Sequence, residues 1–247
     1  MSEETVGGWH AVLALLERSP ERVLSIWLDR ARKGERRVQL MKAARVAGVV
    51  VEETNAESLD RQAGHGNHQG VVARCRVAAE RNEADLKAFL ANLPEKPLLL
   101  VLDGIQDPHN LGACLRSADA AGAQAVILPR DNSSPITPVV RKVASGAAET
   151  LPVFQVTNLA RVLEELKAAG VWLTGAAGEA EQDLYDVDLR GPTALVLGAE
   201  GTGLRRLTRD KCDYLVRIPM VGTVESLNVS VAAGICLFEA VRQRRSG

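Results

Sequence analysis

The stretch "PLLLVLDGIQDPHNLGACLRSADAAGAQAVILP" (97–129) decides the fold class of the chain. An apolar run at 98–104 is followed by a helical pattern at 111–121 and by a second apolar run at 125–129. Because both runs are apolar at consecutive positions, they are typical of strands in a parallel sheet that is buried on both faces. The stretch therefore predicts a strand–helix–strand unit of an α/β protein.

The same alternation continues to the C-terminus and predicts a mostly parallel sheet with helices on both faces. In such a sheet, ligands bind outside the carboxyl ends of the strands, so the turns that leave the strands carry most of the functional information. Further strands are expected at 151–156, 171–175, 193–198 and 214–219, and further helices near 137–146, 159–169, 204–210 and 227–243.

Residues 1–77 are expected to form a separate, small α/β domain. Residues 78–96 are polar and charged, and they predict a linker that contains a short helix. Residues 97–247 then form the second domain. Within the first domain, helices are expected at 8–18 and 36–48, and strands at 23–29, 49–53 and 68–75.

The composition is that of an ordinary soluble globular protein, because 46% of the 247 residues are hydrophobic and 25% are charged. The start of the chain does not resemble a signal peptide, and no apolar run is long enough to cross a bilayer. The expectation is a cytoplasmic protein without membrane contact. The four cysteines are scattered and have no histidine at ligand spacing, so no metal is expected.

The charge of the chain is almost balanced, and a formal net charge of −1 argues against a protein that coats nucleic acid by bulk electrostatics. Local clusters of cations occur at 30–37, 205–211 and 242–245. A solvated helix face explains each cluster alone, whereas three in one chain favour a phosphate-rich partner. Because residues 1–77 carry a net charge of +2 and the remainder −3, "RARKGERR" (30–37) is a candidate phosphate contact.

Three turns carry more polar residues than packing requires: "QDPHN" (106–110), "LGAEGTGL" (197–204) and "IPMVGTVESLN" (218–228). All three follow strands and are expected on the same rim of the sheet. Their glycine spacing fits neither G-x-G-x-x-G nor G-x-x-x-x-G-K-[ST], which disfavours a dinucleotide or Walker-type phosphate loop. The turns predict a ligand site on that rim but do not identify the ligand.

Single residues of these turns have both structural and functional interpretations. Asn110 and Ser226 stand where helix N-caps belong, and capping alone would explain them. Asn228 lies further into the expected helix and is less easily explained as a cap. Glu200 places a carboxylate in a glycine-rich turn, where it can accept from a ligand hydroxyl or amine. Arg116 lies on a helix surface made of Ala, Ser and Asp, where an arginine is usually solvated.

Together and in this order, the turns resemble the three signature motifs of the SpoU family of RNA ribose 2′-O-methyltransferases. The matching residues are "DPHNLGACLRSADAAGA" (107–123), "ALVLGAEGTGL" (194–204) and "IPMVGTVESLNVSVAAGICLFEA" (218–240). The resemblance covers about residues 97–247. The N-terminal part, with "GWHAVLALLE" and "HQGVVARC", is similar to the substrate-binding domain of the branch that methylates a guanosine in the P loop of 23S rRNA.

The resemblance implies a fold and an assembly that the strand pattern does not give. In this superfamily the C-terminal chain forms a deep trefoil knot, although chains in general do not knot, and the N-terminal α/β domain is ribosomal-protein-like. S-adenosylmethionine binds in the knot as methyl donor. The implied partners are 23S rRNA, modified during ribosome biogenesis, and a second copy that completes the active site. The helix expected at 227–243 suits a homodimer, with an apolar face of Leu227, Val231, Ile235, Phe238 and Val241.

Matching positions also imply roles for single residues in the attack of a ribose 2′-oxygen on the sulfonium methyl group. The family view often assigns removal of the hydroxyl proton to the arginine. Because a guanidinium is effectively always protonated, electrostatic stabilisation of the developing alkoxide is the alternative. The implied catalytic set is Asn110, Arg116, Glu200, Ser226 and Asn228. The implied cofactor-binding set is Thr174, Gly175, Gly198, Ile218, Met220 and Leu227.

Three other functions stay open at this point. A non-catalytic RNA-binding protein would explain the basic clusters, but it would not need the polar set around a cofactor pocket. A nucleotide-dependent oxidoreductase is disfavoured by the missing dinucleotide fingerprint. Within the family, a methyltransferase for tRNA or for another rRNA site is the remaining alternative.

Overall fold

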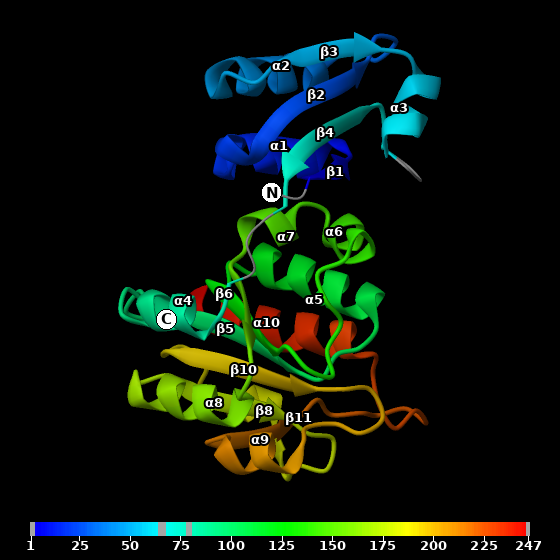
Figure 1. The fold of residues 1–247 in the computed structure, drawn as a ribbon. Helices are drawn as coiled ribbons and strands as arrows, with labels where there is room; N and C mark the ends of the chain where they lie inside the picture. Colours follow the sequence, from blue (N-terminus) through cyan, green and yellow to red (C-terminus); the bar gives the residue numbers. More distant parts are fainter. Residues whose placement is uncertain (1–2, 64–67, 78–80, 246–247) are drawn as a thin grey trace. The chain divides into compact units, whose positions relative to one another are not determined.

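The computed structural model describes residues 3–63, 68–77 and 81–245, and the chain divides into two compact units (Figure 1). The first comprises Met1–Ala79 and Arg141–Thr150, and the second comprises Glu80–Val140 and Leu151–Gly247. The domain boundaries expected from the sequence, at residues 77 and 97, stay a prediction. The short helix expected within 78–96 is present as α4 (Glu83–Leu90), which begins with a capping box at Asn82.

The first unit contains a mixed four-stranded sheet with the order β1-β4-β2-β3. Strand β4 is antiparallel to β1 and β2, whereas β2 and β3 are parallel. The strands are β1 (Glu3–Gly7), β2 (Val23–Asp29), β3 (Val51–Thr54) and β4 (Val71–Arg76). The helices are α1 (Trp9–Arg18), α2 (Glu35–Ala47), α3 (Ala56–Ala63), α7 (Ala147–Thr150) and a 3-10 turn at Pro20–Arg22, while α6 (Pro138–Ala144) spans the boundary between the units.

Among the strands and α-helices of this unit, β1, α3 and the short α7 have no counterpart in the sequence-based expectation. Strand β1 buries only Val6, so its short sequence shows no alternation of apolar and polar residues. Helix α3 likewise has a single buried apolar residue, Leu59. Both elements are therefore held by pairing and packing with the rest of the sheet, which a local pattern does not report.

The second unit is built on a seven-stranded sheet with the order β7-β6-β5-β10-β8-β11-β9, and every neighbouring pair of strands is parallel. The expected mostly parallel sheet is thereby confirmed. The strands are β5 (Leu98–Asp103), β6 (Ala125–Pro129), β7 (Val153–Val156), β8 (Trp172–Ala176), β9 (Gln182–Asp183), β10 (Thr193–Gly198) and β11 (Tyr214–Arg217).

Helices cover both faces of this sheet (Figure 1). On one face, Leu99 and Val101 of β5 share a core cluster with Leu86 of α4 and Leu163 of α8. On the other face, α5 and α10 pack against each other, and α10 also packs against β10. The helices of the second unit are α4, α5 (Pro108–Ala120), α8 (Leu159–Ala168), α9 (Arg206–Lys211) and α10 (Val229–Arg245), with a 3-10 turn at Leu184–Asp186.

The N-caps expected at Asn110 and Ser226 are wrong. Helix α5 begins at Pro108, and its cap is Asp107, which accepts a hydrogen bond from the His109 backbone N at 2.8 Å. The fixed φ of proline suits the first position of a helix. Pro108 is therefore the first helical residue, and the cap is the residue before it, Asp107. Helix α10 begins at Val229, so Ser226 lies outside it.

Helix α10 has apolar residues on two sides. The residues that face the unit's own core include Ala233, Cys236 and Leu237. Val231 and Phe238, which belong to the face expected to be buried in a homodimer, are 50% and 49% exposed in the single chain. The helix therefore has a second apolar side that this chain alone does not cover.

The turn after β10 depends on a glycine at its start. The loop folds back on itself, because the Gly203 backbone N donates to the Ala199 carbonyl at 2.9 Å. A Cβ atom on Gly198 would lie 2.0 Å from the carbonyl carbon of Gly203. Any side chain at Gly198 would therefore force the backbone of the loop to move.

We expect Gly198→Ala to lower the midpoint of thermal unfolding by about 6 °C or more, because a methyl group pressed against backbone cannot be relieved by a change of rotamer. The matched control is Gly191→Ala, where an added Cβ has no atom within 4 Å. Circular dichroism melting of both variants checks this expectation. Equal midpoints for the two variants would contradict the close approach at Gly198.

Candidate functional site

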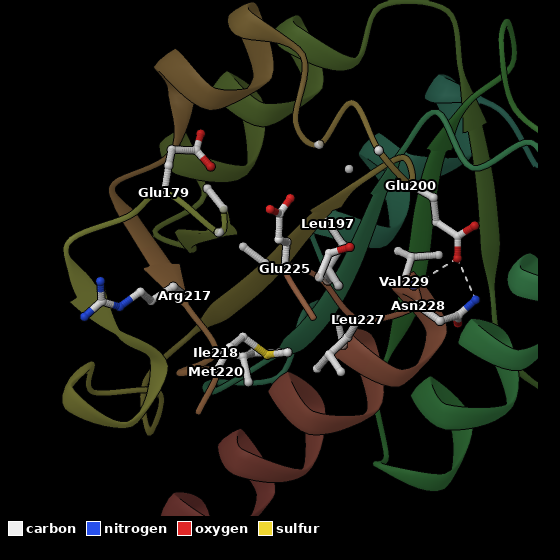
Figure 2. Close-up of a pocket in the computed structure, with 18 of the residues that line it drawn as sticks. Glu179, Leu197, Glu200, Arg217, Ile218, Met220, Glu225, Leu227, Asn228 and Val229 are labelled. Carbon is white, nitrogen blue, oxygen red and sulfur yellow. Dashed lines mark hydrogen bonds between the residues drawn. The ribbon is translucent and has the colours of Figure 1, made fainter. Parts of the chain in front are cut away.

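A crevice of about 1230 Å³ lies at the carboxyl ends of β8, β10 and β11. Three turns line it, and two of them are the second and third polar turns of the sequence. Figure 2 shows side chains from these turns arranged around the open centre. The lining residues are 176–179, 197–204, 216–220 and 222–229, together with Ala232.

The side-chain amide of Asn228 joins all three polar turns. Its Nδ2 donates to Asn110 Oδ1 at 2.9 Å and to Glu200 Oε1 at 2.5 Å. Glu200 Oε1 also accepts from the Val229 backbone N at 3.4 Å. The expectation that the three turns share one rim is confirmed, since these residues come from α5, the loop after β10 and the start of α10.

The oxygen of the same amide is also engaged, and Asn228 is the cap of α10. Its Oδ1 accepts from the Ser230 backbone N at 2.9 Å and from the Ser230 hydroxyl at 2.6 Å. Asn110 is buried, at 8% exposure. With donors and acceptor satisfied, the amide of Asn228 has one favourable orientation.

Four of the six residues expected to bind a cofactor line the crevice: Gly198, Ile218, Met220 and Leu227. Figure 2 shows the side chains of Ile218, Met220 and Leu227 beside the opening. Together they provide an apolar wall, while Gly198 provides bare backbone.

The other two expected cofactor residues, Thr174 and Gly175, do not line the crevice. Both lie in β8, where Thr174 is buried and Gly175 has Leu204 and Leu215 packed against it. The lining begins one residue later, at Ala176.

Charged residues outside the two expected site sets also line the crevice. Figure 2 shows Glu179, Glu225 and Arg217 around it, in addition to Glu200. Arg217 Nε donates to Asp183 Oδ1 at 2.7 Å, so its charge is partly neutralised. Glu179 belongs to the turn after β8, a fourth turn at the same rim. Its position after a predicted strand was the signal that could have identified it.

Ser226 and Arg116 differ in their relation to the crevice. Ser226 is exposed and lines it. Arg116 is exposed on α5 and does not line it. Within the described part of the chain, the Arg116 side chain has neither a hydrogen-bond nor a salt-bridge partner, so its guanidinium is available for a ligand.

Neither thiolate chemistry nor a built metal cluster is evident in the described residues. Burial raises the pKa of the Cys114 thiol to about 12, and the negative charge of Glu200 adds to this effect. Burial also raises the pKa values of the other three cysteines to about 12, so all four are thiols at neutral pH. The described ranges hold no group of three or more His, Cys, Asp or Glu residues placed to bind a metal ion. None of the described helices is long and apolar enough to cross a membrane.

Family models match both parts of the sequence. The SpoU rRNA Methylase family matches residues 97–238, and the RNA 2'-O ribose methyltransferase substrate binding family matches residues 5–80. The 23S rRNA (guanosine-2'-O-)-methyltransferase RlmB of Shewanella oneidensis is 56% identical over 244 residues, which is 99% of either chain. The enzyme of the same name from Vibrio parahaemolyticus is 54% identical over 99% of this chain and 98% of its own.

Solved structures show the same architecture. The SpoU methyltransferase AviRb from Streptomyces viridochromogenes, in complex with the cofactor AdoMet, superimposes with a TM-score of 0.80 at 28% identity. The match covers 99% of this chain and 92% of AviRb. The resemblance seen in the three motifs is thereby confirmed over the whole length. The chain belongs to the SpoU rRNA methylase family.

Proposed function

We propose that this chain transfers a methyl group from S-adenosylmethionine to the ribose 2′-oxygen of a guanosine in 23S rRNA. It is an rRNA (guanosine-2′-O-)-methyltransferase, and the observation that carries this is the 56% identity to a relative of that name across 99% of both chains. The target guanosine lies in the P loop of the peptidyl-transferase centre, and the reaction takes place in the cytoplasm during ribosome biogenesis.

The direct test is methylation of 23S rRNA by the purified protein with radiolabelled S-adenosylmethionine, followed by mapping of 2′-O-methyl positions. We expect one labelled guanosine, within the P loop. Label in tRNA, or at another position of the rRNA, would favour the alternatives within the family. Absence of any label together with tight RNA binding would favour a non-catalytic RNA-binding protein.

The crevice fits S-adenosylmethionine in size and chemistry. Its volume of about 1230 Å³ is ample for a cofactor, since ligand pockets are commonly about 300–1,000 Å³. Ile218, Met220 and Leu227 offer an apolar wall for the adenine ring, and Gly198 allows close approach of a ribose to backbone. Thr174 and Gly175 support the site from within β8. When bound, S-adenosylmethionine supplies an electrophilic methyl group on a positively charged sulfur.

The polar residues on the rim orient the RNA. Glu200 has a carboxylate at the mouth of the crevice that can accept from a ribose or base N–H or O–H group. Asn228 and Asn110 hold that carboxylate in place, and Ser226 adds a hydroxyl to the same rim. Holding both reactants in line contributes on the order of 7–11 kcal/mol to catalysis, so a strong base is not required.

Arg116 completes the site from a second copy of the chain. Arg116 is exposed and unpaired among the described residues, yet it does not line the crevice of its own chain. In a homodimer, the guanidinium of one protomer reaches the crevice of the other. There it binds the RNA phosphate and stabilises the developing alkoxide, a role in which a permanent charge is an advantage.

We expect Arg116→Ala to leave the affinity for S-adenosylmethionine and the thermal stability nearly unchanged, because an exposed arginine has few packing contacts to lose. Methyl transfer should fall by about a hundredfold or more, the scale for one preorganised transition-state donor. Calorimetry and single-turnover kinetics measure the two quantities. Wild-type turnover in this variant, or a loss of cofactor binding equal to the loss of activity, would remove Arg116 from this role.

The uncovered side of α10 is the proposed dimer surface. Val231 and Phe238 are half exposed and lie seven residues apart, so they are on one face of the helix, with Ile235 between them. Gly234 on the same helix lies beside Ser117 of α5, which brings this face next to the helix that carries Arg116.

We expect Phe238→Asp to shift the protein from dimer to monomer in sedimentation at micromolar concentration, because a carboxylate would be buried against an apolar partner face. Turnover should fall with the loss of the dimer, while the free monomer keeps its fold. Leu207→Asp is the control, since Leu207 is 60% exposed on α9, away from this face. A fully active monomer would overturn the shared site.

The order of the elements supports our proposal of a deep knot in the C-terminal chain. Strand β11 lies on the far side of β8 from β10, yet α10, which comes next in the chain, packs on α5 and β10. The connecting residues 218–220 and 222–228 line the crevice together with the loops 176–179 and 197–204. This path supports threading of the C-terminal segment through the preceding loops.

Residues 5–80 match the substrate-binding family, and we assign RNA docking to this part of the chain. Arg30, Lys33 and Arg36 are exposed at the start of α2 and its preceding loop. Within the described ranges their side chains have no ion-pair partner, whereas Arg37 pairs with Glu53. The three free cations are the candidates for phosphate contacts.

A further inference from the structure

The carboxyl group of Asp103 has no part in the network around Asn228. Asp103 is the last residue of β5 and pairs in register with Gly198, the last residue of β10. Its side chain is 0% exposed, and it does not line the crevice. A carboxylate at that depth needs a partner, because an unpaired buried charge is strongly destabilising.

That partner is Arg205, which binds both oxygens of the carboxylate. Oδ2 of Asp103 accepts from the Arg205 backbone N at 3.1 Å, and Oδ1 accepts from Nε at 2.6 Å. The terminal Nη2 of the guanidinium also contacts Oδ1. Asp103 therefore fixes the backbone of Arg205 as well as its side chain, whose outer part stays half exposed.

Arg205 is the residue at which the loop carrying Glu200 ends. The loop leaves β10 at Gly198, and α9 begins at Arg206. Leu204 packs against β8, since a Cβ on Gly175 would lie 2.9 Å from its Cδ1 atom. The far end of the loop is thus fixed at two consecutive residues, while Glu200 reaches from the middle of the loop to Asn228.

We propose that Asp103 and Arg205 form a positioning pair, which holds the loop 199–204 closed so that Glu200 meets Asn228 and the loop walls the cofactor crevice. A loop fixed at both ends has fewer conformations to lose when a ligand binds. Without the pair, the loop loses its direct hydrogen bonds to the end of β5, and its far end is held by Leu204 and by α9. This inference rests on the proposed methyl transfer, because it assigns a role within that site.

The test compares Arg205→Ala with the wild-type protein in steady-state methylation of 23S rRNA. We expect the KM for S-adenosylmethionine to rise by about tenfold or more, the scale of one lost charge-assisted hydrogen bond. The kcat should fall as well, while the KM for rRNA stays unchanged. Arg205→Lys should recover part of the loss, because lysine keeps the charge without the planar fork. If Arg205→Ala only lowered the folding stability, the fraction of active protein would fall, and the KM values for S-adenosylmethionine and for rRNA would both stay unchanged.

A second readout does not depend on activity. Amide hydrogen exchange of residues 199–204, measured without cofactor, should be faster in Arg205→Ala than in the wild type. Asp103→Asn should act in the same direction, and the double variant should be no worse than Arg205→Ala alone, since both changes break one contact. If Arg205→Ala does not fold, because it leaves the buried Asp103 carboxylate without its guanidinium partner, the double variant Asp103→Asn/Arg205→Ala provides the test, since it removes both charges together.

The matched control is Arg190→Ala, which breaks a similar pair elsewhere in the unit. Arg190 binds Asp188 through Nε at 2.9 Å and Nη2 at 2.8 Å, but both side chains are exposed and belong to another loop. We expect wild-type KM values and exchange rates for this variant. Wild-type values in Arg205→Ala, or a rise in the KM for rRNA alone, would overturn the positioning role. Failure of the wild-type protein to bind S-adenosylmethionine would instead overturn the proposed function.

Discussion

The contact on which the site depends is the hydrogen-bonded amide of Asn228. It links a residue of α5 and a residue of the loop after β10 to the start of α10, although Asn110 lies 118 positions away in the sequence. Both polar ends of the amide are engaged, so a rotation or a shift of any one turn would leave a donor or an acceptor without a partner. The three turns are therefore placed by one another rather than by their local sequences.

The sheet explains why polar residues gather at this rim. Because helices cover both faces, the middle of each strand is apolar on consecutive positions, as in β5 and β10. Functional side chains can then occupy only the strand ends and the turns that follow. Asp103 stands at this boundary, which is why a fully buried carboxylate and a solvent-facing crevice occur within a few residues of each other.

The amino-acid sequence predicted the parts of the fold that depend on local patterns. The buried strands and long helices of the second unit were found because consecutive apolar residues and helical spacing are local signals. Strand β1 and helix α3 were missed because each buries a single apolar side chain. The caps were misplaced because proline at position 108 moves the start of α5, which turned Asn110 from a cap into a buried partner of Asn228.

For the site, too, local motifs were predicted and long-range contacts were missed. Glu200 and Asn228 were found through motifs, but Arg205 appeared only as part of a basic cluster, since its partner is 102 residues away. Thr174 and Gly175 were expected to bind a cofactor but do not line the crevice, because a motif fixes a position along a strand but not which residue first emerges from the sheet.

These contacts bear on how the reaction is accelerated. A 2′-hydroxyl is a weak nucleophile, and the four thiols are held protonated by burial, which leaves them unsuited to nucleophilic or basic roles. In the proposed reaction the site acts by positioning the reactants, through an amide and a carboxylate whose positions are set by contacts between distant turns. An active site that works by positioning its reactants becomes slower when a contact that holds the positioning residues is weakened. This happens even if no group that touches the substrate has changed. The interactions that fold the turns together are, on this view, the same ones that bring the two reactants into line.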